Sequence, residues 1–187
     1  MSPMGIVRTL LGAVLLLGCG GGPPARAFRA VFQEAELSFD FEVQSLHRDA
    51  SVRVRDIPEK QGPSDRMLSL QPGSETVVWL YHYEDDGTPL ADEDRAFSVA
   101  LSLRKPEPGR LLFPTDRASA VFFCDNWGRG FRAAEARARE GWLVVRESGD
   151  RSLAGEFDLV FEGTKERQDW TYDPFRVRLE GRFNASR

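Results

Sequence analysis

The densest group of residues with chemical potential is an acidic stretch between two apolar segments. Six carboxylates lie within the eleven residues 84–94. Calcium takes about six to eight oxygen ligands and tolerates irregular loops. The spacing is not that of an EF-hand, because acids do not alternate before Gly87. A solvated acidic hairpin loop is the simpler interpretation, and a calcium site is the alternative. The candidate ligands are Glu84, Asp85, Asp86, Asp92 and Asp94.

The two histidines, His47 and His82, do not form a recognisable zinc motif. A zinc site needs about three or four grouped ligands, and His82 has only Glu84 close by in sequence. For nucleophilic catalysis, no Gly-x-Ser-x-Gly elbow is present. The 29 acidic residues always allow some carboxylate pair for glycoside hydrolysis. We therefore predict no catalytic residue, and a hydrolase with an acidic active site is the weakest alternative.

Aromatic residues in polar loops are the candidates for ligand binding. Trp127 is followed by Gly-Arg-Gly, and Trp170 and Tyr172 lie in a short run that begins and ends with aspartate. Aromatic rings present a large apolar surface, and Tyr and Trp add a polar group for hydrogen bonding. Carbohydrate-binding sandwiches use exposed tryptophans in this way. We therefore take Trp127, Trp170 and Tyr172 as the hypothetical binding residues of a carbohydrate-binding module.

The elements that must position these residues have the pattern of β-strands. Apolar and polar residues alternate with a period of two, which is typical of strands with one buried and one solvated face. The clearest segments are 37–43, 97–103, 157–162 and 175–180, with a weaker example at 51–55. Turn signals separate them, for example Pro72-Gly73-Ser74 and Ser148-Gly149-Asp150.

Two segments depart from simple alternation. Residues 76–83 carry apolar groups on both faces, which predicts a central strand covered on both sides. Residues 131–140 are rich in Ala, Glu and Arg and have high helix propensity, yet Ala134, Ala136 and Ala138 alternate with charged residues. We favour a strand at 131–140 and leave one short helix as the alternative. The whole pattern predicts an all-β fold, an antiparallel β-sandwich or barrel.

The N-terminus carries the pattern of an export signal. An apolar run from Ile6 ends in Leu16-Leu17-Gly18-Cys19, and three glycines follow. This segment resembles the lipobox of bacterial lipoprotein precursors. The alternatives are an ordinary signal peptide cut near Ala25 or Ala27 and a retained N-terminal anchor helix, for which the apolar run is short. The glycine and phenylalanine rhythm of residues 141–183 resembles that of uncharacterised β-sandwich lipoproteins, in which strands end in Gly-x-Phe.

The resemblance implies a specific processing of the chain. Residues 1–18 are then a signal peptide, Cys19 is the lipidation site that carries palmitate or a similar acyl chain, and 19–27 form a lipidated, flexible tether. Residues 28–187 are a single β domain. Gly20, rather than an aspartate after the cysteine, implies sorting to the outer membrane of a Gram-negative bacterium. Cys124 then has no intramolecular disulfide partner, and its apolar neighbours predict a buried, inert thiol.

Charge and composition limit the partners. The net charge of the chain is −4, with no basic tract, which argues against nucleic-acid binding. The sequence predicts a lipid-anchored cell-envelope protein with a non-catalytic binding or structural role and no cofactor. Its partners would be the membrane, through the lipid, and an envelope protein or glycan. A calcium- or carbohydrate-binding sandwich is the alternative.

Overall fold

The computed structural model describes residues 28–32, 36–39, 41–57, 65–84, 95–128, 131–169 and 171–187. Every element assigned in this part of the chain is a β-strand, so the predicted all-β class is confirmed. No helix among the described residues has the length and apolarity needed to span a bilayer. The strands are β1 (Phe28–Phe32), β2 (Glu36–Phe39), β3 (Val43–Ile57), β4 (Asp65–Pro72), β5 (Glu75–Glu84), β6 (Arg95–Leu103), β7 (Gly109–Phe113), β8 (Ala118–Gly128), β9 (Phe131–Ser148), β10 (Ser152–Arg167) and β11 (Tyr172–Ser186).

The described strands form one sheet that curls back on itself. Its order is β2-β1-β11-β10-β9-β8-β6-β5-β3-β4, and β7 pairs with the second half of β9. All of these pairings are antiparallel. A parallel bridge between Ser186 of β11 and Ser45 of β3 joins the two sides of the sheet. The backbone N–H of Asn184 donates to Gln44 Oε1 at 2.8 Å beside this bridge. The arrangement is therefore barrel-like, closed where β11 meets β3.

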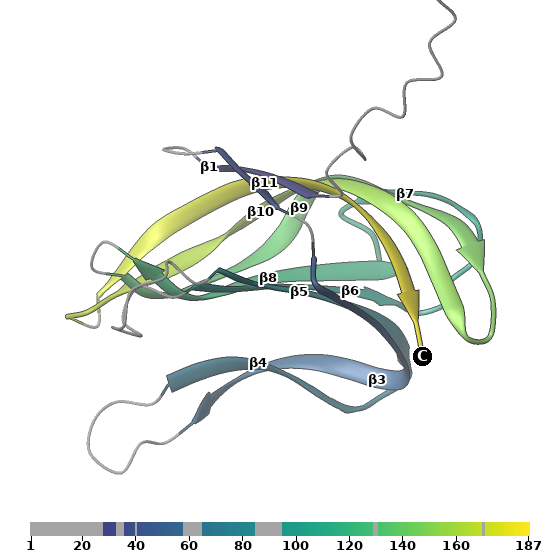
Figure 1. The fold of residues 1–187 in the computed structure, drawn as a ribbon, viewed down its shortest axis with the longest axis horizontal. Helices are drawn as coiled ribbons and strands as arrows, with labels where there is room; N and C mark the ends of the chain where they lie inside the picture. The colour runs from purple at the N-terminus through teal and green to yellow at the C-terminus, as the bar shows by residue number, and fades with distance from the viewer. Residues whose placement is uncertain are drawn as a thin grey trace, which may run out of the picture.

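Three layers are visible in the curled sheet. Figure 1 shows β1, β9, β10 and β11 above, β5, β6 and β8 in the middle, and the β3–β4 hairpin below. The larger core lies inside the closed part and contains Phe97, Phe122, Phe157 and Phe161, all nearly inaccessible to solvent. A smaller core that includes Leu68, Ala100 and Val121, with Trp79 packed against it, joins the hairpin to the outer face of the middle layer.

The prediction that residues 76–83 form a central strand covered on both sides is confirmed. Val78 and Leu80 of β5 belong to the larger core, while Val77 belongs to the smaller core on the opposite face. Because β5 is covered on both sides, its sequence is apolar at consecutive positions. Ser98 and Ser102 on β6 are also buried, with Ala100 between them, so small side chains line the centre of the smaller core.

The open alternative at 131–140 is resolved in favour of the strand. Residues 131–140 form the first part of β9, and the short helix is wrong. Ala134 and Ala136 are buried in the larger core, and this half of β9 pairs with β8 on one side and β10 on the other. Ladder hydrogen bonds with two neighbours outweigh the helix propensity of an Ala-rich segment, which is a weak local preference.

One predicted strand is divided in two. The alternation over residues 37–43 suggests a single strand, but β2 ends at Phe39 and β3 begins at Val43. The reason is a change of partner, because β2 pairs with β1 whereas β3 pairs with β5. Alternation of apolar and polar residues shows only which face of a strand each side chain lies on. The alternation can therefore continue unbroken where the chain passes from one strand partner to another.

Candidate functional site

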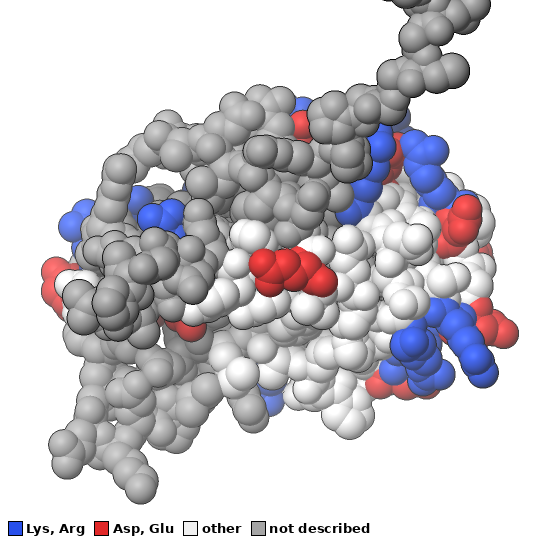
Figure 2. Space-filling model, in the orientation of Figure 1, with Lys and Arg blue, Asp and Glu red and all other residues white. Residues whose placement is uncertain are grey.

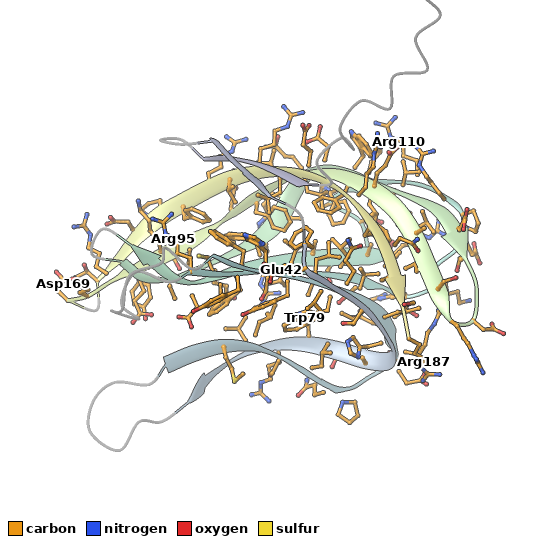
Figure 3. All side chains as sticks on the ribbon, viewed as in Figure 1. Glu42, Trp79, Arg95, Arg110, Asp169 and Arg187 are labelled. Atoms are coloured by element: carbon orange, nitrogen blue, oxygen red, sulfur yellow. The ribbon has the colours of Figure 1, made fainter. Side chains whose placement is uncertain are left out.

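The candidate site is a recess at the end of the molecule where the sheet closes. It consists of two adjoining depressions of about 630 Å³ and 500 Å³. Arg48, Asp49 and Arg187 line both of them. Figure 3 labels Arg187 at the end of β11, beside the sharp bend of β3. We call these two depressions together the closure recess.

The bend of β3 creates one wall of the closure recess. Asp49 has a φ of 51°, in the left-handed region that aspartate tolerates better than most residues. The register with β5 shifts between His47 and Ala50, so the strand leaves β5 there and continues as the hairpin with β4. Gly73 donates its backbone N–H to Asp49 O at 3.0 Å, and a Cβ at residue 73 would lie 2.6 Å from Ala50 O. The Pro72-Gly73-Ser74 turn therefore fits against the bend only with glycine at its centre.

Arg48 is the side chain that joins the walls of the recess. Its Nη1 donates to Thr76 Oγ1 on β5 at 2.9 Å, and its Nη2 donates to Gly149 O in the β9–β10 turn at 2.5 Å. A guanidinium group offers five N–H donors in a rigid fork, and these two bonds use two of them. Arg48 makes no ion pair with any residue in the described part of the chain. The recess therefore contains a fixed, half-buried positive charge without a carboxylate partner among those residues.

Both signs of charge line the closure recess. Figure 2 shows basic and acidic side chains side by side at this end of the molecule. Of the lining carboxylates, Glu107 pairs with a residue outside the lining, Arg117, at 3.6 Å. The other charged residues that line it are Asp49, Glu75, Arg104, Lys105, Asp150 and Arg187, and no ion pair within the described chain involves any of these six.

A serine and a histidine meet in the smaller depression. Ser45 Oγ and His47 Nε2 are 2.9 Å apart, on the same face of β3, and Ser186 pairs with Ser45 across the closure. A nucleophilic serine needs a base that is itself oriented by a third group. No described side chain makes a hydrogen bond that would orient His47 in this way. The pair therefore offers the recess hydrogen-bonding groups.

The outward faces of β9, β10 and β11 carry a contrasting pattern of charge. Arginines on β9 and β11 pair with carboxylates on β9 and β10, and we call this array the charged ladder. Arg178 makes two bonds to Asp158, at 2.7 Å and 2.5 Å, and these bonds with the carboxylate charge raise the pKa of Arg178. Arg146 contacts Glu156 at 2.7 Å, and Arg176 contacts Glu140 at 3.3 Å. The ladder satisfies its own charges, which the closure recess does not.

Of the three predicted aromatic binding residues, the structure describes the side chain of Tyr172, which follows the β10–β11 loop. Tyr172 begins β11 and is 55% exposed. Asp169 accepts hydrogen bonds from the hydroxyl and the backbone N–H of Thr171, at 2.6 Å and 3.2 Å, and these bonds lower the pKa of Asp169. Arg167 holds Asp173 through two nitrogen atoms, and this contact raises the pKa of Arg167. The loop thus presents Tyr172 on a framework with defined hydrogen bonds.

The other predicted binding residues are described only in part. Trp127 lies in strand β8 and not in a loop as predicted, and the structure describes only its backbone. Trp170 lies outside the described residues. The structure therefore does not bring the aromatic candidates together or separate them. Cys19 also lies outside the described residues.

The predicted calcium ligands fall almost wholly outside the described chain. Glu84 ends β5, and Asp85, Asp86, Asp92 and Asp94 are not described. Within the residues that are described, no group of three or more His, Cys, Asp or Glu side chains could hold a metal ion. His82 faces Glu42, with Nδ1 3.5 Å from Oε1, and its ring stacks on Phe97.

The prediction that Cys124 is buried is confirmed. Its side chain is inaccessible in the larger core, and Sγ lies 3.4 Å from Asp125 O. Phe97 and Phe122 belong to the same buried apolar cluster as Cys124, which fits a structural thiol.

Sequence reasoning did not find the closure recess, because its residues come from five separate segments. Arg48, Thr76, Lys105, Gly149 and Arg187 share no motif, and three of them lie in turns or loops or at the end of a strand. No protein-family model matches the chain, and no match was found among the curated proteins or the solved structures that were compared with it.

Proposed function

We propose that the chain is a lipid-anchored cell-envelope protein that binds a small ligand in the closure recess without catalysis. The half-buried Arg48, fixed by two hydrogen bonds and without an ion-pair partner among the described residues, is the observation that supports a binding role. Small-molecule sites commonly have volumes of about 300–1,000 Å³. The two depressions have volumes of this size, but they are open to solvent and the larger one is lined mainly by charged and polar side chains, which favours a charged ligand.

The proposed location rests on the N-terminal sequence. Leu16-Leu17-Gly18-Cys19 supplies the lipidation motif, and Gly20 supplies the proposed sorting signal to the outer membrane. Each buried methylene contributes about 0.8 kcal/mol to membrane binding, and one acyl chain alone is marginal. Two or three chains on Cys19 would therefore hold the domain stably at the membrane surface.

Incorporation of radiolabelled palmitate in cells tests the anchor. We expect label on the native chain and none on Cys19→Ala. Cys124→Ala is the matched control, because it removes the other cysteine and must keep the label. Equal labelling of the native chain and Cys19→Ala would overturn the proposed anchor.

Carbohydrate binding at the β10–β11 loop is a second candidate function. The exposed ring of Tyr172, on a loop held by the Asp169–Thr171 and Arg167–Asp173 contacts, favours it. An aromatic ring offers a large apolar surface on which the apolar face of a sugar can stack. Binding to a glycan panel, compared with Tyr172→Ala, tests this role. A panel without any binding would remove it.

A further inference from the structure

The charges of the closure recess differ from those of the charged ladder in one respect. Arg146, Arg176 and Arg178 each contact a carboxylate in the ladder. Arg48 in the recess contacts a hydroxyl and a carbonyl, and pairs with no carboxylate of the described chain. Arginine and carboxylate side chains therefore pair directly in the ladder, whereas the arginine of the recess makes no such pair with a described residue.

The position of Arg48 is fixed before any ligand arrives. Thr76 holds it from β5 and Gly149 holds it from the β9–β10 turn, so three segments define the guanidinium plane. A planar guanidinium binds carboxylates through two parallel hydrogen bonds. A ligand therefore gains a charge-assisted contact without the entropic cost of ordering the arginine.

The acidic residues that line the recess disfavour a ligand that carries only negative charge. Asp49 lies next to Arg48 in sequence and also lines both depressions, and Glu75 and Asp150 line the larger one. A ligand with only negative charge would face these carboxylates at close range, and like charges brought together reduce affinity. A ligand that carries both an ammonium and a carboxylate group matches both the acidic and the basic side chains that line the recess.

The smaller depression adds further hydrogen-bonding groups beside the charged residues. Ser45, His47 and Gln71 line it. Backbone amides of a peptide need donors and acceptors of this kind along their length. Arg48, Asp49 and Arg187 line both depressions, so a ligand of a few residues held at Arg48 has hydrogen-bonding groups of both depressions close by.

We propose that the closure recess binds a short zwitterionic peptide, with its free carboxylate on Arg48 and its free ammonium group facing Asp49 and Glu75. This inference rests on the proposed binding role and names its ligand class. It does not depend on the lipid anchor, so the two can fail separately.

Isothermal titration calorimetry with trialanine as the probe tests the proposal on the full chain in mild detergent. We expect saturable binding of trialanine, and at least about tenfold weaker binding when its amine is acetylated or its carboxylate is amidated, a factor that corresponds to about 1.4 kcal/mol. These comparisons change only the peptide, so they do not depend on the folding of a variant.

Protein variants locate the site. Arg48→Gln is expected to weaken trialanine binding at least about tenfold. Glu75→Gln is also expected to weaken it, because it removes an acidic group that faces the ammonium group but leaves the two hydrogen bonds of Arg48 in place. Arg146→Gln in the charged ladder is the matched control and must bind like the native chain. Circular dichroism and melting temperature check that each variant is folded.

Three results would overturn the inference. They are no binding of trialanine, binding of the acetylated or amidated peptide as tight as that of trialanine, and native affinity for trialanine in either folded variant, Arg48→Gln or Glu75→Gln. Cys19→Ala must bind trialanine as the native chain does. A failed palmitate experiment therefore rejects the anchor, and a failed titration rejects the peptide site.

Discussion

Phe183 lies directly opposite Gly155 across the β10–β11 pair, and its ring fills the space that a side chain at residue 155 would need. A Cβ at Gly155 would lie 2.6 Å from Phe183 Cζ and would also collide with the carbonyl oxygen of Val144. Phe157 and Gly181 form a second glycine–phenylalanine pair in the same ladder. Cross-strand pairing thus explains the glycine and phenylalanine rhythm in this part of the sequence.

Gly155→Ala is expected to destabilise the fold. Adding a methyl group to a well-packed position forces neighbours to move and costs about 1–3 kcal/mol. Urea denaturation measures the free energy of unfolding. Gly149→Ala is the control, because its Cβ would meet only Ser152, no closer than 3.4 Å. Equal stability of the two variants would contradict the packing described for Phe183.

The thiol of Cys124 is expected to be unreactive in the native state. Its side chain is inaccessible to solvent, so a thiol reagent such as Ellman's reagent must wait for the core to open. We expect no release of thionitrobenzoate over minutes from the folded Cys19→Ala chain, in which Cys124 is the remaining cysteine, and rapid release in denaturant. Immediate reaction of Cys124 in the folded chain would show that the core around it is open.

The carboxyl group of Asp169 is expected to titrate below its ordinary pKa of 3.8, because the hydroxyl and the backbone N–H of Thr171 donate to the ionised form. Since the folded-state pKa is lower than the unfolded one, this contribution to stability is complete above the unfolded value. It is lost as the pH falls through the folded value.

NMR titration of the Thr171 amide measures this pKa. Thr171→Val removes the hydroxyl donor and should move the pKa of Asp169 upward, towards its ordinary value. The same pKa in the native chain and in Thr171→Val would contradict the hydrogen bond between the two side chains.

Local patterns predicted much of the fold because burial alternates along each strand. The alternation over 157–162 and 175–180 identifies parts of β10 and β11, whose buried residues include Phe157, Leu159 and Val177. The two-sided apolar pattern of 76–83 predicts the central position of β5 for the same reason. These patterns depend on which face of one strand is covered, which is a local property.

Strand partners, by contrast, are set by contacts between residues far apart in the chain. Nothing in the sequence near Ser45 or Ser186 indicates that they form the bridge that closes the sheet. The division between Phe39 and Val43 was missed because the two strands keep the same alternation while changing partners. The closure recess was missed for the same reason, since Arg48 acquires its neighbours Thr76 and Gly149 only when the sheet curls.

The proposed anchor at Cys19 is tested most directly by mass spectrometry of the mature N-terminus. Trypsin cleavage after Arg26 releases residues 19–26 as one peptide if the signal peptide ends at Gly18. We expect this peptide to begin at Cys19 and to carry the mass of a diacylglyceryl group on its sulfur. A mature chain that begins at any other residue, or a peptide 19–26 with a free thiol, would contradict it.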